Sequence, residues 1–335
     1  MTGVIQMAHG SGGKLSHELV EKLMVPAFSN PALNTLHDGA QLPVDGTRLA
    51  FSTDSFVVKP RFFPGGDIGK LAVCGTVNDV AMNGAKPLYL SAGFIIEEGF
   101  PLDELAQIVS SMSRAAAEAQ ISIVTGDTKV VEKGAVDGLY INTSGLGFIP
   151  AGVDIAPARV RPGQKVIVSG FLGDHSIAVM SERHGLKLPA AVKSDCAPLG
   201  GLVQAMLAAA PGIALLRDPS RGGLATTLNE IATQANVGIM IDESAVPVRP
   251  EVQAVCDILG FDPMYLANEG KLVAFTEQSD AQAVLTAMHN HPYGCDARVI
   301  GTVAERPAGQ VGLRTAIGGI RLLDMLTGEQ LPRIC

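Results

Sequence analysis

Apolar segments of strand length that end in an acidic turn recur along the first half of this sequence. Residues 48–56, RLAFSTDSF, and residues 121–131, ISIVTGDTKVV, are two such segments. They alternate with amphipathic helices, of which residues 101–119 give the clearest example. That helix has Pro101 in its first turn, and its apolar stripe consists of Leu102, Leu105, Ile108, Val109, Met112 and Ala116. This alternation predicts a mixed fold of strands and helices with carboxylates at strand ends.

The organisation of the chain predicts two domains. Its length of 335 residues favours two domains over one. Between them, Pro157 and Pro162 flank a short basic stretch before a new strand begins, so we place the boundary near Gly152. The second half then repeats the mixture with strand 165–170, helix 176–185, a glycine-rich helix start at 218–223, and strands 271–277 and 297–303.

Four aspartates of the first half sit at positions that resemble loops: Asp38, Asp54, Asp79 and Asp127. Carboxylates at the ends of apolar strands can converge on one edge of a sheet, where hard oxygen ligands suit Mg²⁺ bound to phosphates. The alternative for each aspartate is that it closes a turn or caps a helix. The presence of all four favours a site for Mg²⁺ and a nucleotide.

A glycine-rich stretch near the N-terminus contains Gly10, Gly12 and Gly13, followed by Lys14. Glycine backbone can approach phosphates closely and a lysine can pair with their charge, so a nucleotide-covering loop is one interpretation. The stretch is not a P-loop, because Leu15 stands where Ser or Thr should follow the lysine. A mobile arm is the alternative.

Three further motifs each allow two interpretations. Residues 221–223, Arg-Gly-Gly, offer N–H groups and a cation to an anion, or pack tightly at a helix start. His175 lies in a Gly-Asp-His turn, which is either functional or the capped start of a helix. His289 and His291 alternate like a metal motif, or belong to a polar loop before Pro292.

Composition argues against several classes of partner and location. The formal net charge is −8 and neither Lys nor Arg forms a run, so we expect no nucleic-acid partner and no membrane surface. The N-terminus lacks the basic start and apolar stretch of a secretory signal, and the most apolar window, residues 201–216, is too short to span a bilayer. We therefore expect a cytoplasmic protein.

The cysteines indicate neither a disulfide framework nor a structural zinc site. The set is odd in number, widely spaced and without a C-x-x-C pair: Cys74, Cys196, Cys256, Cys295 and Cys335. We expect the first four to behave as small buried hydrophobes. Cys335 is the last residue of the sequence, and a reactive side chain in that position is either accidental or meant to move.

Together these segments carry a resemblance that runs over essentially the whole chain. HGSGGKLS, STDSF, GTVNDVAMNGAKP, TGDTKVV, DPSRGGLATTLNEIA, ANEGKLV and the final PRIC resemble the HypE family of hydrogenase maturation factors, which are carbamoyl dehydratases. That family is similar to aminoimidazole ribonucleotide synthetase, selenophosphate synthetase and thiamine-monophosphate kinase. The resemblance implies an α+β, two-domain PurM-like fold and a homodimer formed by the N-terminal sheets. The corresponding units are an ATP-binding domain (1–152), an α+β domain (153–312) and a mobile tail (313–335).

The resemblance also implies a reaction. In the family, a HypF-like carbamoyltransferase places a carboxamide on the terminal thiol, here Cys335. The HypE protein then uses ATP to remove water and leave a thiocyanate, whose cyano group passes to the iron centre assembled on a HypC–HypD complex. Hydroxide is a poor leaving group, so phosphorylation of the amide oxygen by ATP makes chemical sense of the dehydration.

Site residues follow from the same resemblance. Lys129 and Glu269 are expected beside the tail, with Glu269 as the base and Asp79 close to both metal and substrate. The alternatives are that Lys129 pairs with Asp127 or a phosphate, and that Glu269 is an exposed loop carboxylate. Asp38, Asp54, Asp79 and Asp127 are the expected Mg²⁺ ligands. The nucleotide is expected to contact Gly10, Gly12, Gly13, Lys14, Asp54, Asn78, Asp127 and Thr128.

Two other functional classes remain open from the sequence. A small-molecule synthetase or kinase of the same superfamily explains the aspartates and glycines but gives Cys335 no task. A non-catalytic thiol carrier explains the tail but makes the clustered aspartates superfluous.

Overall fold

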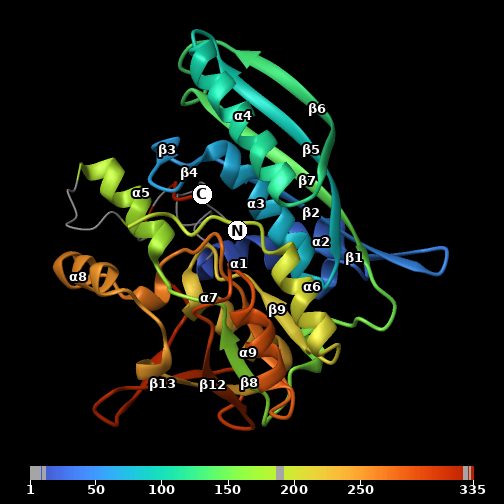
Figure 1. Ribbon diagram of the computed structural model, residues 1–335, viewed down its shortest axis with the longest axis vertical. Coiled ribbons are helices and arrows are strands. Elements are labelled where there is room, and N and C mark those ends of the chain that lie inside the picture. The colour runs from blue at the N-terminus through green and yellow to red at the C-terminus, as the bar shows by residue number, and fades with distance from the viewer. Residues whose placement is uncertain (1–8, 10–12, 186–191, 327–330, 332) are drawn as a thin grey trace.

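The chain forms two domains, each a sheet with helices packed on it, and its C-terminal end lies between them (Figure 1). The computed structural model describes residue 9 and residues 13–185, 192–326, 331 and 333–335. The sheet of the first half has five strands and that of the second half has seven. Phe62–Phe63 (β3) and Gly66–Asp67 (β4) form a small separate hairpin.

The first sheet has the order β1-β2-β7-β5-β6. Its strands are Ala40–Val44 (β1), Thr47–Phe56 (β2), Lys86–Glu97 (β5), Ser122–Val131 (β6) and Leu139–Ile149 (β7). Only β5 and β6 pair in parallel, and the chain between them forms helix α4 (Leu102–Glu118). The expected helix at 101–119 is therefore confirmed. Ile108, Met112 and Ala116 of its predicted stripe are buried, whereas Leu102 is 81% exposed.

Helix α3 (Ile68–Met82) lies between the first sheet and the second domain (Figure 1). Asp67 caps it by accepting hydrogen bonds from the N–H groups of Gly69 and Lys70. Every residue of α3 except Lys70 and Asp79 is buried. A helix that is buried on all sides has no polar face, so its sequence lacks the periodicity by which α4 was recognised.

The placement of α3 corrects the prediction that the four aspartates lie in loops. Asp79 is in the interior of α3, Asp54 is in β2 and Asp127 is in β6. Asp38 alone of the four lies outside a helix or strand. Aspartate has a local preference for turns and helix caps, but tertiary packing overrides that preference here.

The second sheet has the order β14-β13-β10-β12-β8-β11-β9. Its strands are Lys165–Val168 (β8), Leu215–Arg217 (β9), Gly238–Asp242 (β10), Val273–Thr276 (β11), Arg298–Ala304 (β12), Val311–Arg314 (β13) and Ile320–Leu323 (β14). The strands expected at 165–170, 271–277 and 297–303 are all present. Residue 312, the predicted end of the second domain, lies inside β13, so this sheet continues into the segment assigned to the tail.

Helices complete the second domain and the N-terminal segment. They are α5 (Asp174–His184), α6 (Gly200–Ala209), α7 (Gly223–Ala235), α8 (Pro250–Leu259) and α9 (Ala281–His289), with α1 (Lys14–Leu19), a π-helical turn (Val20–Met24) and α2 (Val25–Phe28) near the N-terminus. The predicted glycine-rich helix start corresponds to α7. Among the described residues, no helix combines the length and apolar composition that a bilayer span needs.

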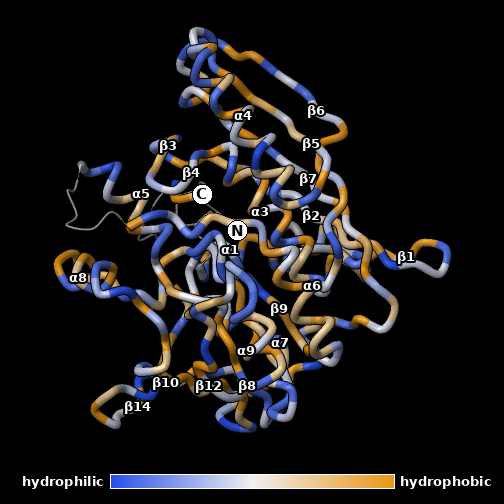
Figure 2. Tube along the Cα trace, in the orientation of Figure 1, coloured by the Kyte–Doolittle hydropathy of each residue, from blue (hydrophilic) through white to orange (hydrophobic). Residues whose placement is uncertain are grey.

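One face of the first sheet has α3 and α4 packed on it, and the other exposes apolar side chains. Phe51 is 42% exposed, Tyr89 48%, Ile95 43% and Phe148 39%. Figure 2 shows hydrophobic segments along β5 and β6. Large apolar side chains gathered on one sheet face are typical of a surface that another molecule covers.

Candidate active site

The described end of the tail is docked between the two domains. The carbonyl oxygen of Cys335 accepts from the N–H of Val57 at 3.2 Å, and that of Arg333 accepts from the N–H of Lys59 at 3.1 Å. Ile334 between them is 5% exposed. Residues 327–330 and 332 of the expected mobile tail lie outside the described residues.

Arg333 anchors this docked segment. Its guanidinium pairs with Asp137 at 2.5 Å, donates to the carbonyl oxygen of Val57 at 2.8 Å and lies over the ring of Tyr140. Hydrogen bonds from Lys59 and then Arg333 lower the pKa of Asp137 to about 2. The ion pair therefore persists at neutral pH, and it fixes the residue two positions before the thiol.

The Cys335 thiol lies among buried charges. Burial raises its pKa to about 12; Arg221 opposes this rise, and the carboxylates of Glu269, Asp54 and Asp218 add to it. The docked sulfur is therefore a neutral thiol at physiological pH and a poor nucleophile. Cys335 is half-buried, and a group already carried by its sulfur would be held beside these carboxylates.

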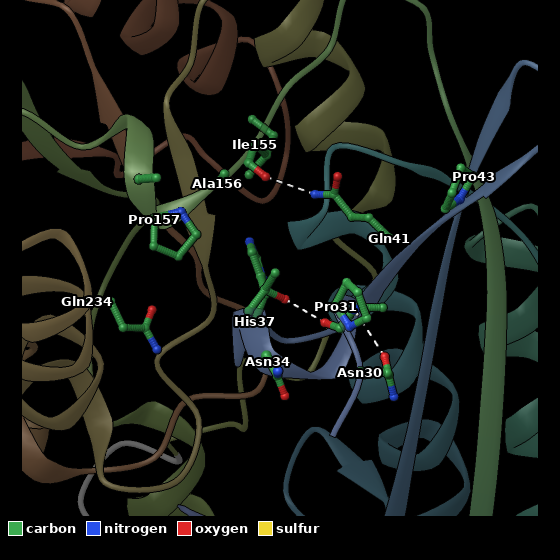
Figure 3. Close-up of a pocket in the computed structure, with 13 residues that line it drawn as sticks. Asn30, Pro31, Asn34, His37, Gln41, Pro43, Ile155, Ala156, Pro157 and Gln234 are labelled. Atoms are coloured by element: carbon green, nitrogen blue, oxygen red, sulfur yellow. Dashed lines mark hydrogen bonds between the residues drawn. The ribbon is translucent and has the colours of Figure 1, made fainter. Parts of the chain in front are cut away.

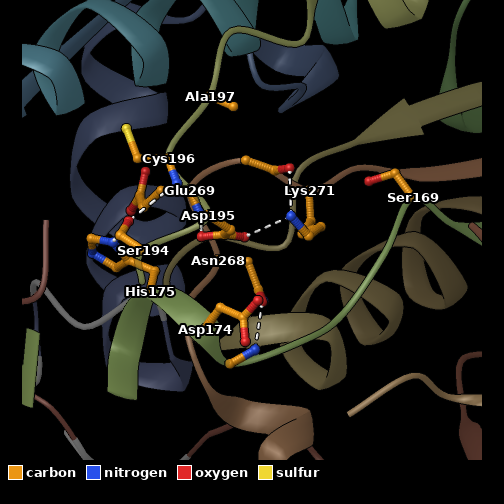
Figure 4. A network of polar contacts seen from close by, with 12 residues as sticks. Ser169, Asp174, His175, Ser194, Asp195, Cys196, Ala197, Asn268, Glu269 and Lys271 are labelled. Atoms are coloured by element: carbon orange, nitrogen blue, oxygen red, sulfur yellow. Dashed lines mark hydrogen bonds and ion pairs between the residues drawn. The ribbon is translucent and has the colours of Figure 1, made fainter. Parts of the chain in front are cut away.

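Glu269, the predicted base, is a buried carboxyl. It is 6% exposed, and its Oε1 is buried without a hydrogen-bond partner among the described residues. Its backbone is held on both sides: its N–H donates to Oδ1 of Asp195 at 3.1 Å, and its carbonyl oxygen accepts from Nδ2 of Asn78 at 3.2 Å. Burial, followed by Cys196 and Asp218, raises the pKa of Glu269 well above its usual range. Figure 4 shows Glu269 beside Asp195 and Cys196.

Three of the four predicted aspartates gather near this point. Burial raises the pKa of Asp79 well above its usual range, and Asp218, Asp54 and Asp38 raise it further. Ser52 joins two of them, because its hydroxyl lies 2.8 Å from Oδ2 of Asp79 and 2.9 Å from the backbone oxygen of Asp38. Like charges crowded into a buried site in this way are typical of a centre that binds a cation or performs chemistry.

Asp218 belongs to the same group, although it was not among the predicted site residues. Burial raises its pKa to about 6. Next to it, Arg217 pairs with Asp38 and with Glu230, each at 2.7 Å. These residues line a cavity of about 300 Å³ together with His9, Ser16, Ser220, Arg221 and Thr227. Asp218 opens the segment DPSRGG after a strand, and that position is the signal by which it could have been found.

The donor set suits Mg²⁺ in kind. It consists of carboxylate oxygens, and Oδ2 of Asp38 is buried without a hydrogen-bond partner among the described residues. No three acidic, histidine or cysteine side chains within the described part of the chain converge on one point as a ready-made metal site. A cation here would therefore be held by few protein ligands and by the phosphates it carries, as Mg²⁺ commonly is.

Asp127, Thr128 and Lys129 are not brought to this group within one protomer. The sheet register aligns Asp127 with Gly93, Gly93 with Asn142, and Asn142 with Ser55 of β2. Three strand spacings of about 4.8 Å put Asp127 about 14 Å from the row position next to Asp54. The prediction that all four aspartates share one site therefore fails for a single chain.

The alternative pairing considered for Lys129 is the one observed. Its Nζ lies 2.6 Å from Oδ2 of Asp127, with both side chains about two-thirds exposed. Thr128 donates its backbone N–H to Oδ1 of the same aspartate at 2.9 Å. The predicted contact between Lys129 and the tail is absent from the described contacts of this protomer.

Asn78 also differs from its prediction as a nucleotide contact. It is 1% exposed. Its amide donates to the carbonyl oxygens of Ala197 and Glu269, and its Oδ1 accepts from the N–H of Leu199 at 2.7 Å. The structure gives Asn78 the task of joining α3 to the second domain.

The described end of the glycine-rich loop packs against Leu326, in the segment assigned to the tail. Lys14 donates its N–H to the carbonyl oxygen of Leu326 at 3.0 Å, and a Cβ on Gly13 would come within 2.2 Å of that oxygen. The Lys14 side chain is exposed. Gly10 and Gly12 lie outside the described residues, so their predicted phosphate contact remains a prediction.

The Arg-Gly-Gly motif begins α7 with both glycines in the left-handed region, at φ +79° and +64°. A Cβ on Gly223 would lie 2.7 Å from the backbone of residues 264–266, so tight packing requires glycine there. Nε2 of His289 donates to the carbonyl oxygen of Ala297, and Nδ1 of His291 accepts from the N–H of Tyr293, which fits the polar-loop interpretation.

A larger cavity of about 680 Å³ lies beside His37 (Figure 3). It is lined by Asn30, Gln41, Ile155, Pro157 and Gln234, among others. Burial lowers the pKa of His37 to about 3, so this imidazole is neutral. Neither Glu269 nor Cys335 lines this cavity, and it is distinct from the site around the tail.

Comparison with known proteins identifies the relatives of this chain. The families described as "AIR synthase related protein" match with their N-terminal domain at residues 36–149 and their C-terminal domain at residues 161–314. The carbamoyl dehydratase HypE of Cupriavidus necator is 54% identical over 335 residues, covering 100% of this chain and 95% of the relative.

Solved structures agree with the sequence relatives. The HypE–HypF complex matches with a TM-score of 0.88 and 47% identity, covering 92% of this chain and 99% of that one. A hydrogenase maturation protein HypE in complex with ATP matches with a TM-score of 0.84 and 50% identity, covering 99% of this chain and 100% of that one.

Proposed function

Because the chain belongs to the HypE family of carbamoyl dehydratases, we propose that it dehydrates an S-carboxamide on its own Cys335 to a thiocyanate, using ATP. The observation that carries this proposal is the position of the thiol. Cys335 lies docked beside Glu269, Asp54 and Asp218, whose charges all act on its pKa. A kinase that acts on a free small molecule has no need for its own chain end in this place.

The carboxamide requires three things of the site, and the chain's residues fit each of them. ATP supplies the phosphoryl group that turns the amide oxygen into a leaving group. Glu269 is placed to take the protons that the amide nitrogen loses, because its unpartnered Oε1 is buried near the sulfur that would carry the amide. Burial of both Glu269 and the tail keeps water from hydrolysing the activated amide.

Asp54, Asp79 and Asp218 are the residues we assign to Mg²⁺ with its nucleotide, with Asp38 beside them. Mg²⁺ supplies charge neutralisation at the phosphates. Burial raises the pKa values of all three carboxyls, neighbouring carboxylates raise those of Asp79 and Asp218 further, and a divalent cation would relieve that repulsion. Arg221 in the adjoining cavity supplies a further positive charge for the phosphates.

We assign Asp127 and Lys129 to the site of a second copy. They lie on the outer strand of the sheet whose uncovered face exposes Tyr89 and Ile95. A homodimer through the N-terminal sheets would cover that face and bring another chain's β6 near the interface. This arrangement accounts for two site residues that the register separates from Asp54 within one chain.

The remaining partners follow from the family. The solved HypE–HypF complex supports a HypF-like carbamoyltransferase as the protein that loads the thiol. We propose that a HypC–HypD complex receives the cyano group, and that the protein works in the cytoplasm beside these partners.

Phosphate release tests the function directly. The chain carrying the carboxamide should release one phosphate per modified tail in a single turnover, and Cys335→Ala should release none with the same partner present. If Cys335→Ala hydrolyses ATP as fast as the wild type while a free small molecule is phosphorylated, the protein is a synthetase or kinase of the same fold. If the chain that carries the carboxamide consumes no ATP, the protein is a non-catalytic carrier.

A further inference from the structure

His175 is a buried titratable residue to which the proposed reaction assigns no task. It is the second residue of α5 and is 0% exposed. Both ring nitrogens are bonded: Nδ1 lies 2.8 Å from the hydroxyl of Ser194, and Nε2 lies 2.8 Å from the carbonyl oxygen of Ile334. One side of this imidazole therefore contacts the protein body and the other contacts the tail.

The partners determine the direction of every hydrogen bond. A carbonyl oxygen only accepts, so Nε2 of His175 carries the proton and donates it to Ile334. The neutral ring then accepts at Nδ1 from the Ser194 hydroxyl, and the Ser194 oxygen accepts in turn from the N–H of Cys196 at 3.1 Å. The chain of bonds runs without conflict from the 194–196 loop to the residue before Cys335.

The ring is held in this orientation by its surroundings. Phe63 packs edge-on against it, with ring centroids 5.4 Å apart. Ser194 is fixed through its own N–H, which donates to the carbonyl oxygen of Pro64 at 2.7 Å. The orientation of the Nε2–H of His175 toward the tail is thus fixed by Ser194 and by Phe63 of the β3–β4 hairpin, both outside the tail.

The same short loop also holds the base. Asp195, between Ser194 and Cys196, accepts the N–H of Glu269 and pairs with Lys271 at 3.4 Å. Figure 4 shows His175, Ser194, Asp195 and Glu269 gathered at this loop. One three-residue segment therefore sets the position of Glu269 on one side and, through His175, that of the Ile334 carbonyl on the other.

We propose that His175 is a positioning residue that latches the docked tail through the Ile334 carbonyl, so that a group on Cys335 stays against Glu269. The catalytic part of this inference rests on the proposed function, whereas the latch itself concerns only where the tail lies. Loss of one hydrogen bond of ordinary net strength shifts the ratio of docked to released tail about fivefold.

Two substitutions separate the latch from a merely structural role. In His175→Gln the side-chain amide nitrogen reaches the place of Nε2 and can still donate to Ile334. In His175→Asn the shorter amide reaches only the place of Nδ1, so it can accept from Ser194 but leaves the Ile334 carbonyl without a donor. Both variants would be made in a Cys295→Ser background, because Cys295 is exposed whereas Cys74, Cys196 and Cys256 are buried.

The first measurement is alkylation of Cys335 by iodoacetamide, which reports tail release without any enzymatic turnover. His175→Asn should be alkylated up to about fivefold faster than the parent, and His175→Gln close to the parent rate. Equal rates in parent and His175→Asn, or equally raised rates in both variants, would overturn the latch. Ser194→Ala, which leaves the imidazole but removes the hydroxyl that orients it, should raise the rate by a smaller factor and serves if His175→Asn fails to fold.

The second measurement separates loading from dehydration. A released tail is available to the carbamoyltransferase but absent from the site. His175→Asn should therefore be carbamoylated at least as fast as the parent, yet dehydrate its loaded tail more slowly with an unchanged KM for ATP; the factor of faster alkylation and the factor of slower dehydration should multiply to about five. A variant slowed equally in both steps would show a general structural defect and overturn the positioning role. Alkylation that follows the prediction in a chain that never dehydrates would instead contradict the proposed function alone.

Discussion

Nδ2 of Asn78 lies 3.2 Å from the backbone carbonyl oxygen of Glu269, and this hydrogen bond joins the central helix of the first domain to the loop that carries the candidate base. The same side chain also receives the N–H of Leu199 and donates to Ala197. Asp79 follows Asn78 directly in α3. The helix that presents the Asp79 carboxylate to the proposed Mg²⁺ site therefore also fixes the position of Glu269. The two halves of the site are thereby held in register by one buried amide.

Asn78→Ala should therefore destabilise the protein and slow dehydration together. The substitution leaves three buried backbone groups without partners, at about 1–3 kcal/mol for each unsatisfied group. Denaturant unfolding should show a loss of several kcal/mol in the free energy of unfolding, whereas Asn290→Ala, at an exposed position after α9, should change it by less than about 0.5 kcal/mol. A stability equal to wild type in Asn78→Ala would show that the two domains are joined by other contacts.

Glu269→Gln should block the chemistry and spare the loading. The amide has nearly the shape of the carboxyl but cannot take a proton, and general-base removal typically costs about 10²–10⁴ in rate. Single-turnover dehydration of the loaded tail should fall by such a factor, with carbamoylation of Cys335 unchanged. Glu98→Gln, at an exposed carboxyl distant in the sequence, is the matched control. Normal dehydration in Glu269→Gln would remove Glu269 as the base.

The docked thiol should show an unusual pH dependence of alkylation. Burial raises the pKa of Cys335 to about 12, so the protonated thiol favours docking, and docking weakens as pH rises above the ordinary thiol value of about 8.5. In a Cys295→Ser chain, alkylation should be slow at pH 8 and still rising above pH 9, where a short cysteine peptide approaches its plateau. Superimposable profiles for the protein and the peptide would mean that the tail spends its time outside the site.

Sites shared between two copies should allow inactive variants to rescue one another. Asp127→Asn and Glu269→Gln are each expected to be inactive as homodimers. In a mixed dimer, the site that keeps Glu269 on one chain receives the intact Asp127 of the other, so mixing the two variants should restore dehydration. Activity that stays at the level of the separate variants would place Asp127 outside the partner's site or outside catalysis.

The sequence predicted the elements better than their assembly. α4 was recognisable because one face of it is polar, while α3 was not, because packing on all sides removes the periodic signal and leaves Asp79 looking like a turn residue. Asp38, Asp54 and Asp79 converge as expected. Asp127 does not, because strand order, which the local sequence does not specify, places three strand spacings between β6 and β2.

Site residues whose role depends on contacts with distant parts of the sequence could not be predicted from their local sequence. Arg217, next to Asp218, completes the charged group through its ion pair with Asp38, which lies far away in the sequence. His175 contacts a carbonyl 159 positions later, and no local pattern distinguishes such a histidine from one at a capped helix start. Site membership of this kind depends on the fold and is visible only once the fold is known.

Intact mass spectrometry with peptide mapping of the tail tests the central claim most directly. The protein would be incubated with its carbamoylating partner, carbamoyl phosphate and ATP, with and without Mg²⁺. The proposed function predicts a carboxamide on Cys335 that loses one water only when ATP and Mg²⁺ are both present. A Cys335 that stays unmodified while ATP is consumed with a free small molecule would contradict it.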